Sequence, residues 1–316
     1  MKIVFAGTPD FAVAPLKNII DNGYEVVGVI TQQDKLQGRK AILTPPPVKT
    51  FAMEKNISVL QPEKIRDEID AVKALGGDLL VTCAYGQILT QAVLDVFPKG
   101  VWNIHAGLLP QYRGASPIQS CILNGESVTG VSIMKTELGL DSGDVLCVEE
   151  TPIEENETYG ELSDRLSVLG ARLIVDALQK IESGNFVLTP QDSDGVQVVR
   201  KINKEHAKID FNRPVNEIIN LVRGMNPAPV SYAILGENKL NIYRAERVDI
   251  FQDDSGMFEN ARVGEVLFDK PKRGLVVKCL DGAIKLTEVQ MAGGKRMSGG
   301  DLLNGRKVQK GQVFTC

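Results

Sequence analysis

Residues 2–31 read KIVFAGTPDFAVAPLKNIIDNGYEVVGVIT, and this stretch decides the fold class. Its two ends, residues 2–6 and 25–31, are short and almost uniformly apolar, which is typical of buried strands rather than surface helices. Between them, residues 11–22 place apolar side chains at helical spacing. A strand, a helix and a second strand in this order predict a parallel sheet covered by helices.

The same alternation continues along the chain as far as residue 183. Short apolar runs predict further strands at residues 78–84, 101–105, 128–136 and 144–153. Amphipathic stretches predict helices at residues 47–55, 64–75 and 160–183. The sequence therefore predicts an α/β fold with a doubly wound, mostly parallel, Rossmann-like sheet.

The pattern changes after residue 183. Residues 184–200 contain glycine, proline, aspartate and serine without helical spacing, which is typical of a linker. One expected helix, residues 214–224, is followed by short strand candidates at residues 231–234, 239–248, 264–267, 274–280 and 283–291. Many short strands separated by turn residues predict a small OB-like β-barrel. We therefore expect a catalytic domain at residues 1–185, a linker at 186–204 and an OB-like domain at 205–316.

Composition excludes several classes of protein. Hydrophobic residues make up 43% of the chain and charged residues 24%, as in ordinary globular proteins. No apolar run approaches the roughly 20 residues that span a bilayer, and the first apolar run is too brief for a signal peptide, so we expect a cytoplasmic protein. Five scattered cysteines and two histidines argue against a disulfide framework and against a zinc site, and we expect no metal.

The charge is unevenly distributed. Residues 201–316 hold 19 basic and 14 acidic residues, a net charge of +5, whereas the rest of the chain carries −9. A basic C-terminal part on an acidic body indicates a polyanionic partner. The competing interpretation is a chance imbalance spread over solvated faces.

A polar pair ends the expected strand at residues 101–105. Alternation along a strand places Asn103 and His105 on the same side, at the edge of the sheet where parallel α/β folds bind ligands. Glycines and prolines follow directly in residues 106–117, which is typical of a shaped loop.

A second turn, residues 139–144 (GLDSGD), supplies a carboxylate that can reach this strand end, Asp141. The Asn103 amide and a His105 N–H can donate to an oxyanion, and the carboxylate can orient the histidine or relay a proton from an attacking amine. Each feature alone has a plainer interpretation, since a lone strand-end histidine is more often structural and this turn sequence is common. The combination favours acyl transfer to an amine.

Several motifs together resemble the folate-dependent formyltransferases, and within them the methionyl-tRNA formyltransferases. In the first part they are residues 5–12 (FAGTPDFA), 84–89 (AYGQIL), 103–105 (NIH), 108–118 (LLPQYRGASPI) and 139–144 (GLDSGD). In the second part they are residues 209–211 (IDF), 222–227 (VRGMNP) and 295–298 (KRMS). The resemblance thus runs along nearly the whole chain.

The resemblance implies 10-formyltetrahydrofolate as formyl donor and the α-amino group of methionyl initiator tRNA as acceptor, with a monomeric protein. It implies Asn103, His105 and Asp141 as catalytic residues. It also implies that two segments contact the folate, namely Gly107, Leu108, Leu109 and Pro110 together with Gln87, Ile88 and Leu89.

A tRNA-contacting loop is implied at residues 34–45 (DKLQGRKAILTP), with Lys35, Arg39 and Lys40 suited to phosphate contacts. Members of the family usually carry a lysine pair where this chain has Ala41 and Ile42, so the loop departs from the pattern. The alternative is a solvated loop without a partner.

Two other functions stay open at this point. One is a formyltransferase for a small amine, such as an amino sugar or glycinamide ribonucleotide. This function would not require the basic C-terminal part. The other is a noncatalytic RNA- or folate-binding relative, which would not require Asn103, His105 and Asp141 together.

Overall fold

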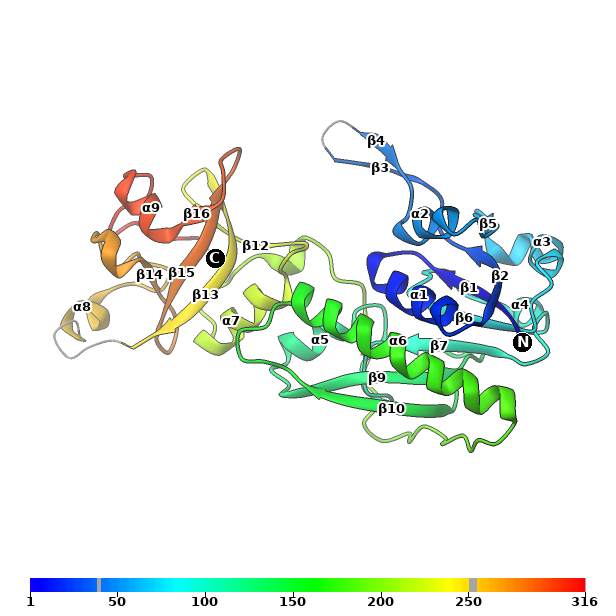
Figure 1. The fold of residues 1–316 in the computed structure, drawn as a ribbon. Helices are drawn as coiled ribbons and strands as arrows, with labels where there is room; N and C mark the ends of the chain where they lie inside the picture. Colours follow the sequence, from blue (N-terminus) through cyan, green and yellow to red (C-terminus); the bar gives the residue numbers. More distant parts are fainter. Residues whose placement is uncertain (39–40, 250–254, 316) are drawn as a thin grey trace. The chain divides into compact units, whose positions relative to one another are not determined.

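The computed structural model describes residues 1–38, 41–249 and 255–315 (Figure 1). Within them the chain forms two compact units. Unit 1 comprises Met1–Pro117, Val128–Pro152 and Ser163–Arg200, and unit 2 comprises Ile118–Ser127, Ile153–Leu162 and Lys201–Cys316. Residues 186–200 of the expected linker thus fall in unit 1, while the expected domain boundaries stay predictions.

Unit 1 is built on a seven-stranded sheet in the order β10-β9-β7-β6-β1-β2-β5. Its strands are β1 (Lys2–Gly7), β2 (Glu25–Ile30), β5 (Val59–Leu60), β6 (Leu79–Cys83), β7 (Val101–His105), β9 (Val128–Lys135) and β10 (Val145–Pro152). The pairs from β7 to β5 are parallel, whereas β9 runs antiparallel to β7 and to β10. The predicted mostly parallel sheet is confirmed.

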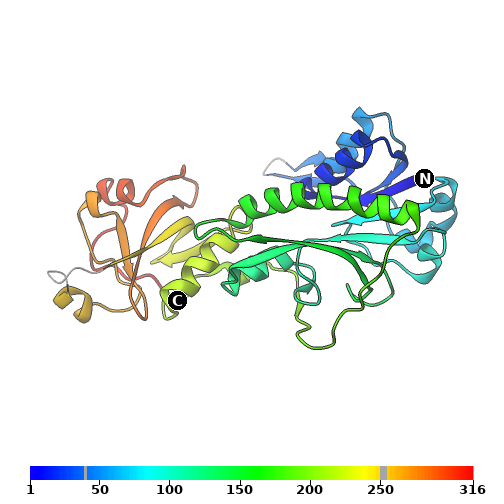
Figure 2. The same ribbon diagram turned by 60° about the horizontal axis from the view of Figure 1, so that its bottom comes forward.

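Helices cover both faces of this sheet. They are α1 (Val13–Asp21), α2 (Pro47–Glu54), α3 (Ile69–Ala74), α4 (Gln91–Leu94) and α6 (Tyr159–Ser183), with short 3-10 turns η1 (Asp10–Ala12) and η2 (Ile65–Asp67). Helix α5 (Pro117–Leu123) belongs to unit 2 from Ile118 onward. Helix α6 lies along β9 and β10 (Figures 1 and 2) and is tied to α1, because Asn18 Nδ2 donates to the Ala171 carbonyl at 2.5 Å. Elements η2, α3 and α4 pack against a separate apolar cluster that includes Val4, Leu80 and Val101.

Strand β7 therefore separates two environments. A Cβ on Gly170 of α6 would lie 3.0 Å from Ile104 Cγ2, so Ile104 faces α6. Val101 belongs to the cluster on the opposite face. Because side chains alternate along a strand, Asn103 and His105 share the face of Val101.

Besides the pairing of β5 with β2, two pairings of unit 1 were not expected from the sequence. The loop at residues 34–45 contains a hairpin of β3 (Lys35–Gln37) and β4 (Ile42–Thr44), which projects beyond α2 in Figure 1. In addition, β11 (Val198–Val199), inside the expected linker, pairs in parallel with β8 (Arg113–Gly114). Both pairings are short, and neither has the apolar alternation that identifies a strand in a sequence.

Unit 2 contains an antiparallel sheet in the order β12-β13-β15-β14, with β16 paired to β15. The strands are β12 (Ser231–Leu235), β13 (Asn238–Val248), β14 (Leu275–Lys278), β15 (Ala283–Met291) and β16 (Met297–Ser298). The other elements are η3 (Glu205–Ala207), α7 (Val215–Gly224), α8 (Ser255–Asn260), η5 (Pro271–Arg273) and α9 (Gly299–Asn304). The sheet encloses a core that includes Phe211, Ile242 and Phe314.

Single bridges join the two edges of this sheet. Val277 of β14 bridges to Val266, Glu265 bridges to Val313, and Ile234 of β12 bridges to Thr315. Residues 264–267, expected as a full strand, thus contribute only bridges. Together with the C-terminal residues, these bridges connect β14 to β12 and close the barrel. The OB-like barrel expected from the sequence is confirmed.

No helix among the described residues is both long enough and apolar enough to cross a membrane.

Candidate active site

Asn103 and His105 end β7 beside the last residues of β6. Thr82 of β6 lies opposite Asn103 in the parallel register. Its hydroxyl donates to Asn103 Oδ1 at 2.8 Å, which fixes the orientation of the amide. With the oxygen engaged, the Asn103 Nδ2 group has no acceptor among the described residues and is free to donate to a ligand.

His105 is almost completely buried, with 4% of its surface exposed. Its Nε2 lies 3.1 Å from the Tyr112 carbonyl oxygen, and its Nδ1 lies 3.7 Å from Asp141 Oδ2. A carbonyl oxygen only accepts, so Nε2 carries the hydrogen and donates it to Tyr112. The neutral ring then presents its Nδ1 lone pair toward the carboxylate.

Burial determines the protonation state of this histidine. Desolvation lowers the pKa of His105 below its usual value of 6.5, and Arg113 acts in the same direction. The Asp141 carboxylate and the Tyr112 carbonyl raise this pKa but do not outweigh burial. His105 is therefore neutral near pH 7 and able to accept a proton at Nδ1.

Asp141 occupies the turn between β9 and β10 in an uncommon backbone conformation. Its φ is 46°, in the left-handed region that costs a non-glycine residue roughly 1 kcal/mol. The Gly114 N–H donates to Asp141 Oδ2 at 2.8 Å. The Gln191 amide nitrogen donates to the carbonyl oxygens of Asp141 at 2.9 Å and of Gly143 at 2.7 Å. Gly114 thus holds the carboxylate of Asp141, and Gln191 holds the backbone of its turn.

The segment Gly107–Pro110 leaves β7 and is supported from β9. The fully buried Ser132 hydroxyl donates to the Gly107 carbonyl at 2.7 Å and accepts from the Leu109 N–H at 3.2 Å. Leu108, Leu109 and Pro110 are half-buried. This loop therefore has a defined shape next to His105.

The segment Gln87–Leu89 follows β6, the neighbour of β7. The Gln87 side chain accepts from the Ile65 N–H at 2.8 Å and donates to the Pro62 carbonyl at 3.2 Å. Leu89 is buried, whereas Ile88 is 85% exposed. The side chain of Gln87 is thus engaged in holding the protein together, which leaves backbone groups and Ile88 for a ligand.

The residues expected to contact tRNA are only partly described. Lys35 lies exposed on β3. Arg39 and Lys40 lie outside the described residues. Around them the hairpin presents apolar side chains, because Leu36, Ile42 and Leu43 are each more than 60% exposed.

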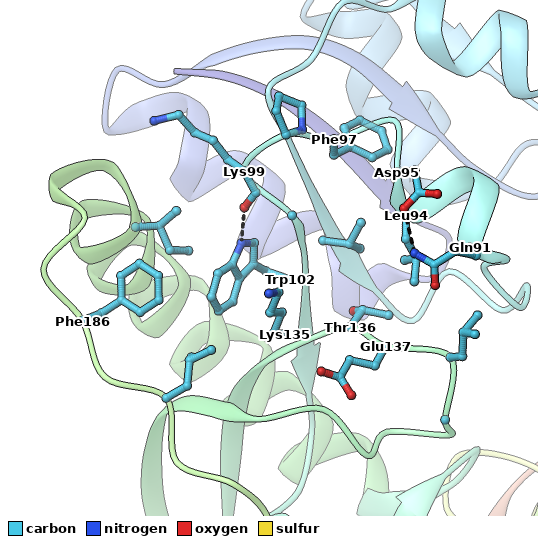
Figure 3. Close-up of a pocket in the computed structure, with 17 residues that line it drawn as sticks. Gln91, Leu94, Asp95, Phe97, Lys99, Trp102, Lys135, Thr136, Glu137 and Phe186 are labelled. Carbon is cyan, nitrogen blue, oxygen red and sulfur yellow. Dashed lines mark hydrogen bonds between the residues drawn. The ribbon is translucent and has the colours of Figure 1, made fainter.

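A cavity of about 810 Å³ lies at the opposite end of β7 (Figure 3). Trp102 and Phe186 meet edge to face in its lining, with ring centroids 5.7 Å apart, and Lys135 and Glu137 lie nearby. Among the described residues that line it, none is an expected catalytic or folate-contacting residue. The cavity is thus separate from the cluster at His105.

Comparison with known proteins places this cluster in a family. Residues 1–178 match the family described as formyl transferase, and residues 201–307 match the formyl transferase C-terminal domain. The chain is 43% identical to a methionyl-tRNA formyltransferase of Ruminiclostridium cellulolyticum, over 99% of both chains. It is 41% identical to that of Bacillus subtilis, over 99% of this chain and 97% of the relative.

The chain belongs to the methionyl-tRNA formyltransferase family. The small-amine and noncatalytic alternatives are not favoured by these relatives. A solved N-formyltransferase from Helicobacter canadensis, in complex with folinic acid and dTDP-3-aminofucose, superposes with a TM-score of 0.67. It covers 90% of this chain and 98% of its own at 20% identity, so it supports the fold alone.

Three residues that support Asn103, Asp141 and the loop after His105 were not predicted from the sequence. Thr82 and Ser132 lie in expected strands, but their partners depend on strand register, which the sequence does not specify. Gln191 lies in a segment expected to be a linker, and the sequence carries no signal for its contacts.

Proposed function

We propose that this formyltransferase moves the formyl group of 10-formyltetrahydrofolate to the α-amino group of methionine carried by initiator tRNA. The observation that carries this proposal is the full-length similarity to methionyl-tRNA formyltransferases. The cluster of a free Asn103 amide, a neutral His105 and the Asp141 carboxylate gives it a chemical basis.

In the proposed reaction the folate supplies the formyl group on its N10 atom. Asn103 Nδ2 donates to the formyl oxygen as the amine nitrogen bonds to the formyl carbon and negative charge develops. His105 Nδ1 accepts the proton that the amine loses, and the Asp141 carboxylate stabilises the resulting imidazolium. The bond between the formyl carbon and N10 then breaks, and the proton is returned to N10.

The acceptor requires little activation. A free α-amine has a pKa of about 7.7–8.0, and an aminoacyl ester should lower it further. Enough neutral amine is therefore present near pH 7, and the task of the enzyme is to position it and to stabilise the oxyanion.

We assign folate contacts to the two loops that leave β6 and β7. Gln87, Ile88 and Leu89 would hold the pterin largely through backbone groups. The loop from Gly107 to Pro110 would lie along the folate, and Ser132 would keep its shape.

For tRNA we propose two contacts. The first is the loop with Lys35, Arg39 and Lys40, whose cationic side chains suit phosphate groups. The second is the basic C-terminal part of the chain, with its net charge of +5. The domain boundaries at residues 1–185, 186–204 and 205–316, the monomeric state and the cytoplasmic location stay predictions.

A product assay tests the proposed function. The protein is incubated with 10-formyltetrahydrofolate and methionyl initiator tRNA, the ester is hydrolysed, and N-formylmethionine is measured. Catalytic formation of N-formylmethionine is the expected result, and the absence of product with active donor and charged tRNA would contradict the proposal.

A further inference from the structure

The segment of residues 184–200, which we call the strap, is bound by its backbone to the loops that surround the catalytic cluster. Thr189 exchanges two backbone hydrogen bonds with Val145, both 2.9 Å long. Farther along, the Gln197 carbonyl accepts from the Arg113 N–H at 2.8 Å, and the Val199 carbonyl accepts from the Ala115 N–H at 3.0 Å. The strap thus contacts both the segment that follows the Asp141 turn and the segment around Gly114, whose N–H binds Asp141 Oδ2.

The side chain of Gln191 joins these two segments between the backbone contacts. Its Oε1 accepts from Arg113 Nε at 2.9 Å and from the Arg113 Nη2 group at 2.7 Å. Its Nε2 donates to the carbonyl oxygens of Asp141 and Gly143. One half-buried amide therefore uses its donors on the turn that carries Asp141 and its acceptor on the loop that follows His105.

The turn needs such support because of its own conformation. Asp141 has a positive φ of 46°, which is unfavourable for a residue with a side chain, so neighbouring contacts must maintain it. Asp141 Oδ2 is 3.7 Å from His105 Nδ1, beyond hydrogen-bond distance, and its hydrogen bond comes from Gly114 instead. The histidine therefore does not hold the turn.

We infer that Gln191 is a positioning residue for formyl transfer: its two N–H donors fix the Asp141 turn against the Arg113 loop and so place the carboxylate at His105 Nδ1. The inference rests on the proposed function, because it assumes that Asp141 acts in catalysis. Gln191 touches neither of the loops assigned to folate, so its loss should affect the chemical step and leave donor binding intact.

Two substitutions separate the roles of the amide. Gln191→Met keeps the volume and removes all four contacts. Gln191→Glu keeps an acceptor for Arg113 but replaces the donors with an oxygen that repels the Asp141 and Gly143 carbonyls. Ser193→Ala, at an exposed position of the strap, serves as the control.

The measurements are kcat and KM for both substrates, together with the melting temperature of each variant. Both Gln191 variants are expected to lose about 10- to 100-fold in kcat, because small displacements of catalytic groups have effects of this size. KM for 10-formyltetrahydrofolate should stay within about twofold of the wild-type value, and Ser193→Ala should match the wild type.

Wild-type kcat in Gln191→Glu would overturn the inference, because the donors to the turn would then be dispensable. A loss that follows the melting temperature, with kcat restored at lower temperature, would also overturn it. If the wild-type protein itself forms no N-formylmethionine, the proposed function fails instead. If Asp141→Ala is fully active in the same assay, the catalytic role of Asp141 fails, and the positioning role of Gln191 fails with it.

Discussion

At the scale of single residues, burial and hydrogen bonding assign different parts to the three catalytic candidates. Thr82 orients the amide of Asn103, and burial keeps His105 neutral. Gly114 holds the Asp141 carboxylate at the edge of the histidine ring. A buried neutral imidazole that faces a carboxylate is suited to take up a proton briefly.

Asp141→Ala should lower the rate of formyl transfer by about 10²- to 10⁴-fold, because proton transfer loses its stabilising charge. Folate binding should persist, since Ser132 rather than Asp141 holds the adjacent loop. Single-turnover kinetics and folate titration measure the two effects. Asp194→Ala, an exposed carboxylate of the strap, is the control, and wild-type turnover in Asp141→Ala would remove Asp141 from the mechanism.

The lowered pKa of His105 predicts a pH dependence of stability. The unfolded chain protonates this histidine near pH 6.5, whereas the folded protein resists protonation until a lower pH. The unfolded state thus binds more protons as the pH falls below 6.5, and the free energy of unfolding decreases. The stability that the buried neutral His105 contributes is fully present above pH 6.5. It declines as the pH falls toward the pKa of His105 in the folded protein, with a slope of at most ~1.4 kcal/mol per pH unit.

Urea unfolding between pH 5 and pH 8 tests this dependence. His105→Gln should flatten the curve below about pH 6.5. Equal curves for the wild type and His105→Gln would contradict the assignment of a buried neutral imidazole.

At the scale of elements, the strap can lie close to β8 because Gly114 has no side chain. A Cβ at this position would lie 2.4 Å from the Val199 carbonyl oxygen. Gly195, in the same strap, also has a positive φ but has open space around it. A comparison of substitutions at the two glycines therefore distinguishes the cost of a steric clash from the cost of a positive φ.

Gly114→Ala should destabilise the protein more than Gly195→Ala does. The control carries only the cost of the left-handed conformation, about 1 kcal/mol. The clash with Val199 should add about 1–3 kcal/mol and should also lower kcat, because the Gly114 N–H moves away from Asp141. Denaturant titration and steady-state kinetics measure both effects, and equal losses in the two variants would contradict the close approach of the strap.

The long elements were predictable and the short pairings were not. Apolar runs identified six of the seven strands of the sheet, all except the two-residue β5, because most residues of these strands are apolar. The hairpin of β3 and β4 was not predicted from the sequence, since Leu36, Ile42 and Leu43 are exposed and bury little surface. Gln191 escaped because its partners, Arg113 and Asp141, are far away in the sequence.

At the scale of the whole molecule, the uneven charge gives the main physical argument for a nucleic-acid partner. Residues 201–316 carry +5 while the rest of the chain carries −9. Basic groups that neutralise phosphates release counterions, so the affinity for tRNA should fall steeply as salt rises.

A filter-binding titration of methionyl-tRNA at increasing salt tests this argument. With several phosphate contacts, the affinity should fall about 10-fold or more between 50 and 200 mM salt. KM for the folate, whose proposed contacts are loops and backbone groups of unit 1, should change far less. A flat response of tRNA affinity would exclude the basic C-terminal part as an electrostatic tRNA-binding surface.

We propose that the chemistry at Asn103, His105 and Asp141 serves a methionine carried by tRNA. The most direct test compares kcat/KM for methionyl initiator tRNA, an amino-sugar nucleotide and glycinamide ribonucleotide, each with 10-formyltetrahydrofolate as donor. We predict that methionyl-tRNA exceeds both small amines by about 10³-fold or more. A small amine formylated as efficiently as methionyl-tRNA, or more efficiently, would contradict methionyl-tRNA as the acceptor.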